Sequence, residues 1–103
     1  MWLTLDSVAH CAAQWQRERT DCSAESERAR AIAAAPRRAQ FLAGRWLAAQ
    51  LLAEHCGGTA GAWQISCTPG QAPRVLDGPA PVRPWLSLAH RDDVLACVLA
   101  DRP

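Results

Sequence analysis

The sequence contains no run of about 20 apolar residues, the length that a helix needs to span a membrane. Its first residues carry Asp6 and His10, where a secretory signal peptide needs a basic start and a longer apolar run. An excess of charge is also missing: the formal net charge is +1, which argues against a polybasic nucleic-acid-binding protein. We therefore expect a cytoplasmic protein that binds neither a membrane nor nucleic acid.

Cys-x-x-Cys pairs are absent as well, although five cysteines are present. An odd number of cysteines without such pairs predicts neither a disulfide framework nor a zinc ribbon. The two His-Cys pairs, His10-Cys11 and His55-Cys56, could in principle assemble a metal site. Adjacent residues of a helix or strand point in different directions, so we favour small core side chains over metal ligands.

The composition is that of a folded globular chain. Half of the 103 residues are apolar and a fifth are charged, which argues against disorder. This length suffices for one hydrophobic core. We expect a single domain over residues 1–103.

Two helices are predicted in the first half of the chain, after a short strand over residues 1–7. Ser23 can cap a helix that continues to about Ala35, with acidic residues in its first turn. Pro36 disfavours helical geometry before it but suits the first turn of a new helix. The second helix should therefore span residues 36–56.

The second predicted helix should form the spine of the core and end at Gly57 and Gly58. Its buried stripe comprises Leu42, Trp46, Ala49 and Ala53. Arginines are concentrated in its first half, which is explained either by a solvated face or by an anion site at the helix N-terminus.

The second half of the chain alternates in hydrophobicity with a period of two, which is typical of strands. Strands are predicted over residues 63–68, 74–76, 85–90 and 94–100. The last of these is apolar on both faces, so we expect it in the centre of a sheet or at a subunit interface. The pattern predicts an α+β fold in which two main helices pack on a small, mostly antiparallel sheet.

His90 ends a predicted strand at a turn, immediately before Arg91. An imidazole, a guanidinium and free turn amides together could bind a phosphate group. The alternative is structural: His90 closes the hairpin by bonding Asp92 or Asp93.

Four segments follow one another in a recognisable order: SAESERARA, RRAQFLAGRWLAAQLLA, GQAPRVLDGP and WLSLAHRDDVLACVLAD. Together they resemble the N-terminal half of the larger, monomeric 4'-phosphopantetheinyl transferases. LSLAH is similar to the Ser-x-Ser-His segment of that family, and FLAGRWL is similar to its Gly-Arg helix. The resemblance extends from Ser23 to Asp101.

The resemblance implies a role in moving phosphopantetheine from coenzyme A to a serine of an acyl or peptidyl carrier protein, with magnesium on the pyrophosphate. It implies that His90 contacts a coenzyme A phosphate, as do Arg37 and Arg38 ahead of the Gly-Arg helix and Arg74 in GQAPRV. Arginine binds such groups through two parallel hydrogen bonds.

The sequence also departs from the family pattern. Ala89 stands where the family usually has a second serine, and Gln71-Ala72 replaces a basic residue before the proline. The Gly-x-Asp-x-Glu motif and the Trp-x-x-Lys-Glu-Ala helix, which supply magnesium ligands and the general base, are absent. We therefore expect the chain alone not to catalyse the full reaction.

Three interpretations follow. The chain is half of a transferase completed by a second polypeptide or a second copy, a non-catalytic module that binds coenzyme A or a carrier protein, or an unrelated small α+β protein. Because a single lobe exposes apolar surface, we expect a homodimer or a complex with the missing C-terminal lobe.

Overall fold

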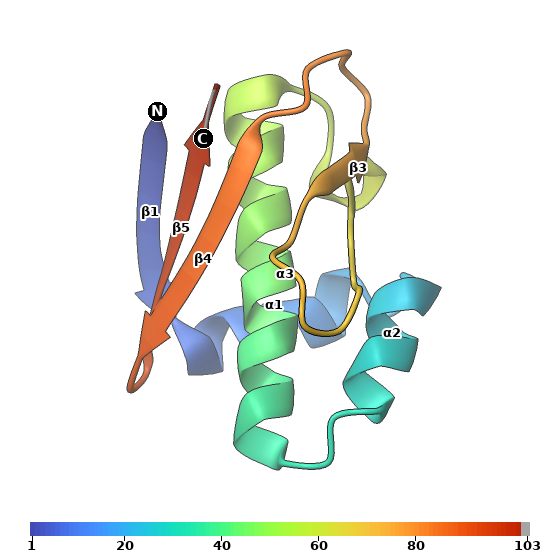
Figure 1. The fold of residues 1–103 in the computed structure, drawn as a ribbon, viewed down its shortest axis with the longest axis vertical. Coiled ribbons are helices and arrows are strands. Elements are labelled where there is room, and N and C mark those ends of the chain that lie inside the picture. Colours follow the sequence, from blue (N-terminus) through green and yellow to red (C-terminus); the bar gives the residue numbers. More distant parts are fainter. Residues whose placement is uncertain (102–103) are drawn as a thin grey trace.

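The computed structural model describes residues 1–101 and combines helices with antiparallel strands (Figure 1). In chain order the elements are β1 (Trp2–Ser7), α1 (Val8–Glu18), α2 (Ser23–Arg30), α3 (Ala35–Cys56), the short 3-10 helix η1 (Ala60–Ala62), β2 (Gln64–Ile65), β3 (Val75–Asp77), β4 (Trp85–Arg91) and β5 (Val94–Ala100). The predicted α+β class is confirmed. No helix within residues 1–101 has the length and hydrophobicity to cross a membrane.

The main sheet has the order β1-β5-β4, with antiparallel pairing throughout. The central position predicted for residues 94–100 is confirmed, because β5 pairs on both sides. Leu95, Cys97 and Leu99 of β5 point toward the core and are buried. The hairpin turn between β4 and β5 is shorter than expected and consists of Asp92 and Asp93.

The strand predicted over residues 63–68 is reduced to the two residues of β2, which pair with β3 in a separate ribbon. We expected this segment in the main sheet, and that expectation was wrong. The helix α3 packs against both the main sheet and β2, so it stands between the two sheets (Figure 1). Trp63, just before β2, is completely buried, and its indole nitrogen donates to the carbonyl of Gly57 at 2.9 Å.

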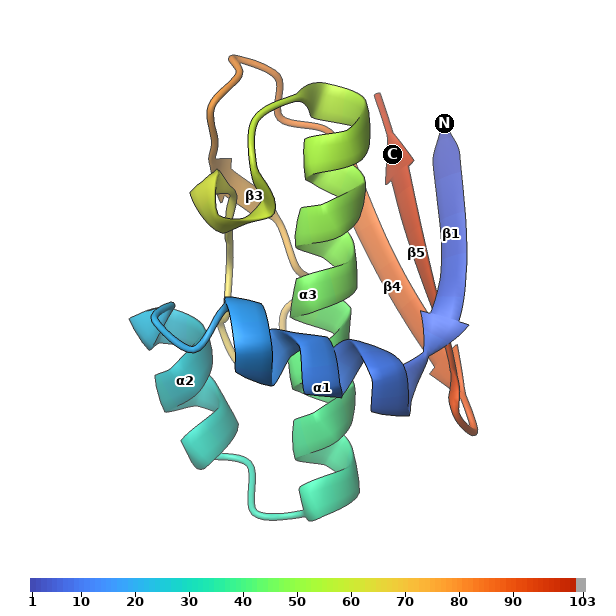
Figure 2. The same ribbon diagram turned by 180° about the vertical axis from the view of Figure 1, so that it is seen from behind.

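Helix α1 was not predicted, although its signal is present in the sequence. The Ser7 side chain accepts a hydrogen bond from the His10 amide at 3.0 Å and so caps the helix. Val8, Cys11 and Trp15, spaced three and four residues apart, are buried. This stripe packs against α3, which α1 crosses at a steep angle (Figure 2).

Helix α2 is shorter than predicted, and Ser23 is not its cap. Cys22 occupies the cap position without a side-chain hydrogen bond, and the helix ends at Arg30 rather than near Ala35. The Arg38 guanidinium donates to two carbonyl oxygens of the linker that follows, at 3.2 and 3.1 Å. These bonds satisfy acceptors that a longer helix would have satisfied internally.

Helix α3 forms the centre of the core, as predicted. Its buried apolar residues include Leu42, Leu47, Leu51 and Leu52. Burying one such side chain stabilises the fold by roughly 1.5–3 kcal/mol. The helix ends at Gly57, whose φ of 101° is readily adopted by glycine and rarely by other residues.

Candidate anion-binding site

A hollow with a volume of about 290 Å³ lies where α2, α3, residues 67–71 and the end of β4 meet. Its basic lining residues are Arg28, Arg37, Arg45 and His90, and we call it the basic hollow. None of the lining residues within the described part of the chain is acidic. The hollow therefore concentrates positive charge although the chain as a whole is nearly neutral.

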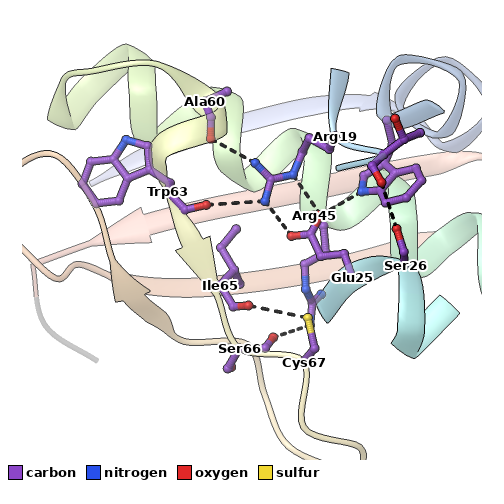
Figure 3. A network of polar contacts seen from close by, with 11 residues as sticks. Arg19, Glu25, Ser26, Arg45, Ala60, Trp63, Ile65, Ser66 and Cys67 are labelled. Carbon is purple, nitrogen blue, oxygen red and sulfur yellow. Dashed lines mark hydrogen bonds and ion pairs between the residues drawn. The ribbon is translucent and has the colours of Figure 1, made fainter. Parts of the chain in front are cut away.

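Arg45 forms the floor of the basic hollow. Its side chain is only 8% exposed, and one terminal nitrogen donates to the carbonyl oxygen of Ser66 at 2.9 Å (Figure 3). Its Nε has no hydrogen-bond partner among residues 1–101. The guanidinium also stacks over the Phe41 ring, 4.5 Å from the centroid. Burial lowers the pKa of Arg45, because water no longer solvates the charge.

A buried guanidinium without a carboxylate partner is costly, since burying an unpaired charge is one of the most unfavourable events in folding. Among the described residues Arg45 forms no ion pair. The Cys67 thiol is a favourable neighbour of this guanidinium, and an anion bound in the basic hollow, which Arg45 lines, would offset its charge further.

The spacing of residues along α3 explains how the helix presents this site. Arg37, Phe41 and Arg45 recur every four residues, so they lie on one helix face. Gly44, beside them, lets β4 approach closely. A Cβ atom at this position would lie 3.0 Å from Cδ1 of Leu88.

His90 lies within β4 rather than at the turn, and it pairs with Leu95 across the sheet. Because side chains alternate along a strand, Arg91 points to the other face and does not line the basic hollow. The expected meeting of this guanidinium and the turn amides with His90 therefore does not occur. No hydrogen bond joins His90 to Asp92 or Asp93 in the part of the chain that the structure describes, so the hairpin-closing alternative gains no support.

Asp93 instead supports the start of α1. Its backbone oxygen accepts from the Val8 amide at 2.8 Å, and its side chain accepts from the Ala9 amide at 3.1 Å. The hairpin turn thus anchors the first helix.

Two of the four predicted coenzyme A residues lie together and two do not. Arg37 and His90 both line the basic hollow. Arg38, one residue on, is rotated by about 100° around the helix and lines a different hollow beside Leu42. Arg74 lies outside as well, in a small hollow with Arg83.

Arg28 and Arg45 line the basic hollow but are not among the four predicted coenzyme A residues. Arg45 does belong to the arginines in the first half of α3, for which an anion site was one of two explanations. A signal existed for Arg45, because it continues the four-residue spacing of Arg37 and Phe41. Arg28 carried no comparable signal, since its place in the basic hollow depends on how α2 packs against α3.

The metal site considered from the two His-Cys pairs does not form. Within residues 1–101, the one group of potential ligands is Asp6, His10 and Cys11, whose ligand atoms lie within 4.8 Å of one another. His55 instead stacks on Trp2, with centroids 4.8 Å apart. Burial raises the pKa of Cys11 to about 12, with smaller contributions from the charge of Asp6 and from a hydrogen bond with that residue. His55 and Cys56 take no part in the group of Asp6, His10 and Cys11.

No family model and no curated protein matches the chain. The resemblance to phosphopantetheinyl transferases therefore stays a prediction from the sequence motifs.

Proposed function

We propose that this chain is a coenzyme A-binding lobe of the phosphopantetheinyl transferase type, and that the basic hollow grips a coenzyme A phosphate. The observation that carries the proposal is the buried Arg45, whose Nε has no hydrogen-bond partner among the described residues. Arg28, Arg37 and His90 surround it with further donors. Phosphate oxygens accept charge-assisted hydrogen bonds from all four side chains, with a histidine contributing most when protonated.

The size of the basic hollow limits what it can hold. Its volume of about 290 Å³ lies just below the range for small-molecule pockets, which begins near 300 Å³. We therefore propose that it accommodates a phosphate-bearing part of coenzyme A, while the pantetheine arm extends along the surface toward a carrier protein.

Magnesium does not fit the residues present. The cluster of Asp6, His10 and Cys11 offers a thiol and an imidazole, whereas magnesium prefers an octahedron of oxygen ligands. The carboxylates for a transfer step would come from a second lobe. This misfit favours a second candidate function, a non-catalytic module that binds coenzyme A or a carrier protein.

We propose a second copy of the chain as the partner of the uncovered face of the main sheet. This face, away from α3, exposes Leu3 by 61% and Leu5 by 62% (Figure 1). The register places them in the same rows as the small residues Ser87 and Ala89 at the other edge. A two-fold axis parallel to the strands would set the leucines of each copy over the small residues of the other.

The area of this face sets the expected strength of the dimer. Strands of six and seven residues are about 20–23 Å long and about 4.8 Å apart. Three of them offer less than the roughly 800 Å² that each partner of a standard interface buries. We therefore expect a weak dimer.

The five free cysteines fit the reducing cytoplasm, which we propose as the location.

Calorimetric titration of the purified chain with coenzyme A tests the function. We expect saturable binding that weakens as salt is added, because the contacts are ionic. Dephospho-coenzyme A and pantetheine, which carry fewer phosphates or none, should bind progressively more weakly. If coenzyme A does not bind at millimolar concentration, coenzyme A binding is excluded for both candidate functions.

A further inference from the structure

A buried ion pair joins α1 to α2 behind the basic hollow. Arg19 is 3% exposed and Glu25 is completely buried. The guanidinium donates from Nε to one carboxylate oxygen at 2.9 Å and from a terminal nitrogen to the other at 2.6 Å. The Trp15 indole donates to the same carboxylate at 2.8 Å. This carboxylate is therefore held from two directions.

Arg19 also reaches the segment that precedes β2. Its terminal nitrogens donate to the carbonyl oxygen of Ala60 at 2.9 Å and to that of Trp63 at 3.4 Å (Figure 3). Burial alone would lower the pKa of Arg19, but the hydrogen bonds and charge of Glu25 outweigh it and raise that pKa. Arg19 thus connects two separate stretches of the chain, α2 through Glu25 and the backbone of residues 60–63.

Both stretches lead directly to walls of the basic hollow. On one side, Glu25 lies three residues before Arg28 on α2, which places the two on neighbouring positions of the same helix. On the other side, the chain continues from Trp63 to residues 67–71, which form the opposite wall. The Arg45 bond to Ser66 secures this second wall to the floor.

The charges behind the basic hollow are unequal. The buried charged side chains within residues 1–101 are Arg19, Glu25 and Arg45, so there are two guanidiniums and one carboxylate. All three hydrogen bonds to this carboxylate come from Trp15 and Arg19. Arg45 therefore keeps its charge available to the hollow.

We propose that the Arg19–Glu25 pair is a positioning device that sets the separation between Arg28 and the 67–71 wall. The inference rests on the proposed function, since it assumes an anionic ligand in the basic hollow. Stability alone explains the pair poorly, because a buried ion pair can often be replaced by apolar residues without loss. A positioning role explains the pair better, because the pair links two walls of the basic hollow that belong to different elements.

The experiment compares coenzyme A affinity and melting temperature in four proteins: wild type, Arg19→Met/Glu25→Leu, Arg28→Ala and the triple combination. We expect the double variant to fold and to bind coenzyme A about 10-fold more weakly. In the Arg28→Ala background the same double change should have a much smaller effect, because the residue that it positions is gone. Leu99→Val, a core change at the end of β5 away from the hollow, controls for altered stability.

Each outcome decides a different question. Wild-type affinity in the double variant, or an equal loss with and without Arg28, overturns the positioning role while the proposed function stands. Absence of coenzyme A binding by the wild type overturns the proposed function, and this inference with it. If the double variant does not fold, Glu25→Asp, which keeps both charges and shortens the carboxylate side chain by one methylene, replaces it. Weaker binding that depends on Arg28 supports the role, and unchanged binding overturns it.

Discussion

The Arg45 guanidinium lies 2.9 Å from the carbonyl oxygen of Ser66, and this hydrogen bond joins α3 to the wall of the basic hollow. The bond satisfies one nitrogen of a side chain that is otherwise buried and has no ion pair among the described residues. Arg45 therefore stabilises the fold less than its burial would suggest. We expect its replacement to affect ligand binding more than stability.

Arg45→Met should weaken coenzyme A binding and leave the unliganded protein as stable as before, or more stable. Removing a charge-assisted hydrogen bond costs on the order of 1.5–3 kcal/mol, which is roughly 10- to 100-fold in affinity. Removing a buried unpaired charge offsets the lost contact to Ser66. Titration and thermal melting of this variant, with the exposed Arg17→Met as control, check both effects. A large fall in melting temperature without any change in affinity would contradict the assignment.

His90→Ala should also weaken coenzyme A binding by roughly 10- to 100-fold, because His90 lines the basic hollow. Arg91→Ala is the matched control, since Arg91 neighbours it on β4 but does not line the hollow. We expect the control to lose much less affinity. Equal losses in both variants would mean that long-range charge, and not contact, explains the effect.

The stability of the protein should fall at high pH because of its buried thiols. Burial raises the pKa of Cys97 from 9.0 to about 12, so the folded state retains a proton that the unfolded chain releases. The free energy of unfolding should be insensitive to this group below pH 9.0 and decline as the pH rises toward about 12. Urea unfolding at several pH values checks the trend. Cys97→Ala should show a smaller decline, and a decline identical to wild type would exclude this thiol as a cause.

Gly78→Ala should destabilise the fold, because a Cβ at this position would lie 2.2 Å from the buried ring of Trp63. Overpacking of this kind typically costs about 1–3 kcal/mol. Gly61→Ala is the control, since nothing lies within 4 Å of its added Cβ. Denaturant unfolding of both variants measures the difference. Equal stability would show that the β2–β3 ribbon moves freely away from α3.

Light scattering across micromolar concentrations should give an average mass that rises toward that of a dimer. Leu5→Asp, on the uncovered sheet face, should abolish the rise, because a charge would be buried between the sheets. Leu76→Asp, at a residue of β3 that is 55% exposed, should leave it unchanged. A wild-type protein that stays monomeric over this range would refute the second-copy proposal.

Local patterns in the chain were sufficient for much of the architecture. Residues 94–100 are apolar on both faces of the predicted strand, which predicted a central position, and β5 is the central strand of the main sheet. The glycines after residue 56 ended α3 where expected. These features depend on near neighbours in sequence, whose geometry is set by backbone sterics and by the periods of helix and strand. The four-residue spacing of Arg37, Phe41 and Arg45 was also visible in the sequence, but the burial of Arg45 was not.

Packing between distant elements determined the rest. Arg28 and His90 are 62 residues apart (90 minus 28), and they share a hollow because α2 and β4 both pack around α3. Arg38 lies outside the basic hollow because successive residues of a helix are rotated by about 100° around its axis. The Arg19–Glu25 pair had no signature in the sequence, since charged residues six positions apart are common and almost always solvated. Its burial arises where the end of α1, α2 and the segment before β2 meet, since Arg19 bonds both to Glu25 and to the backbone of Ala60 and Trp63.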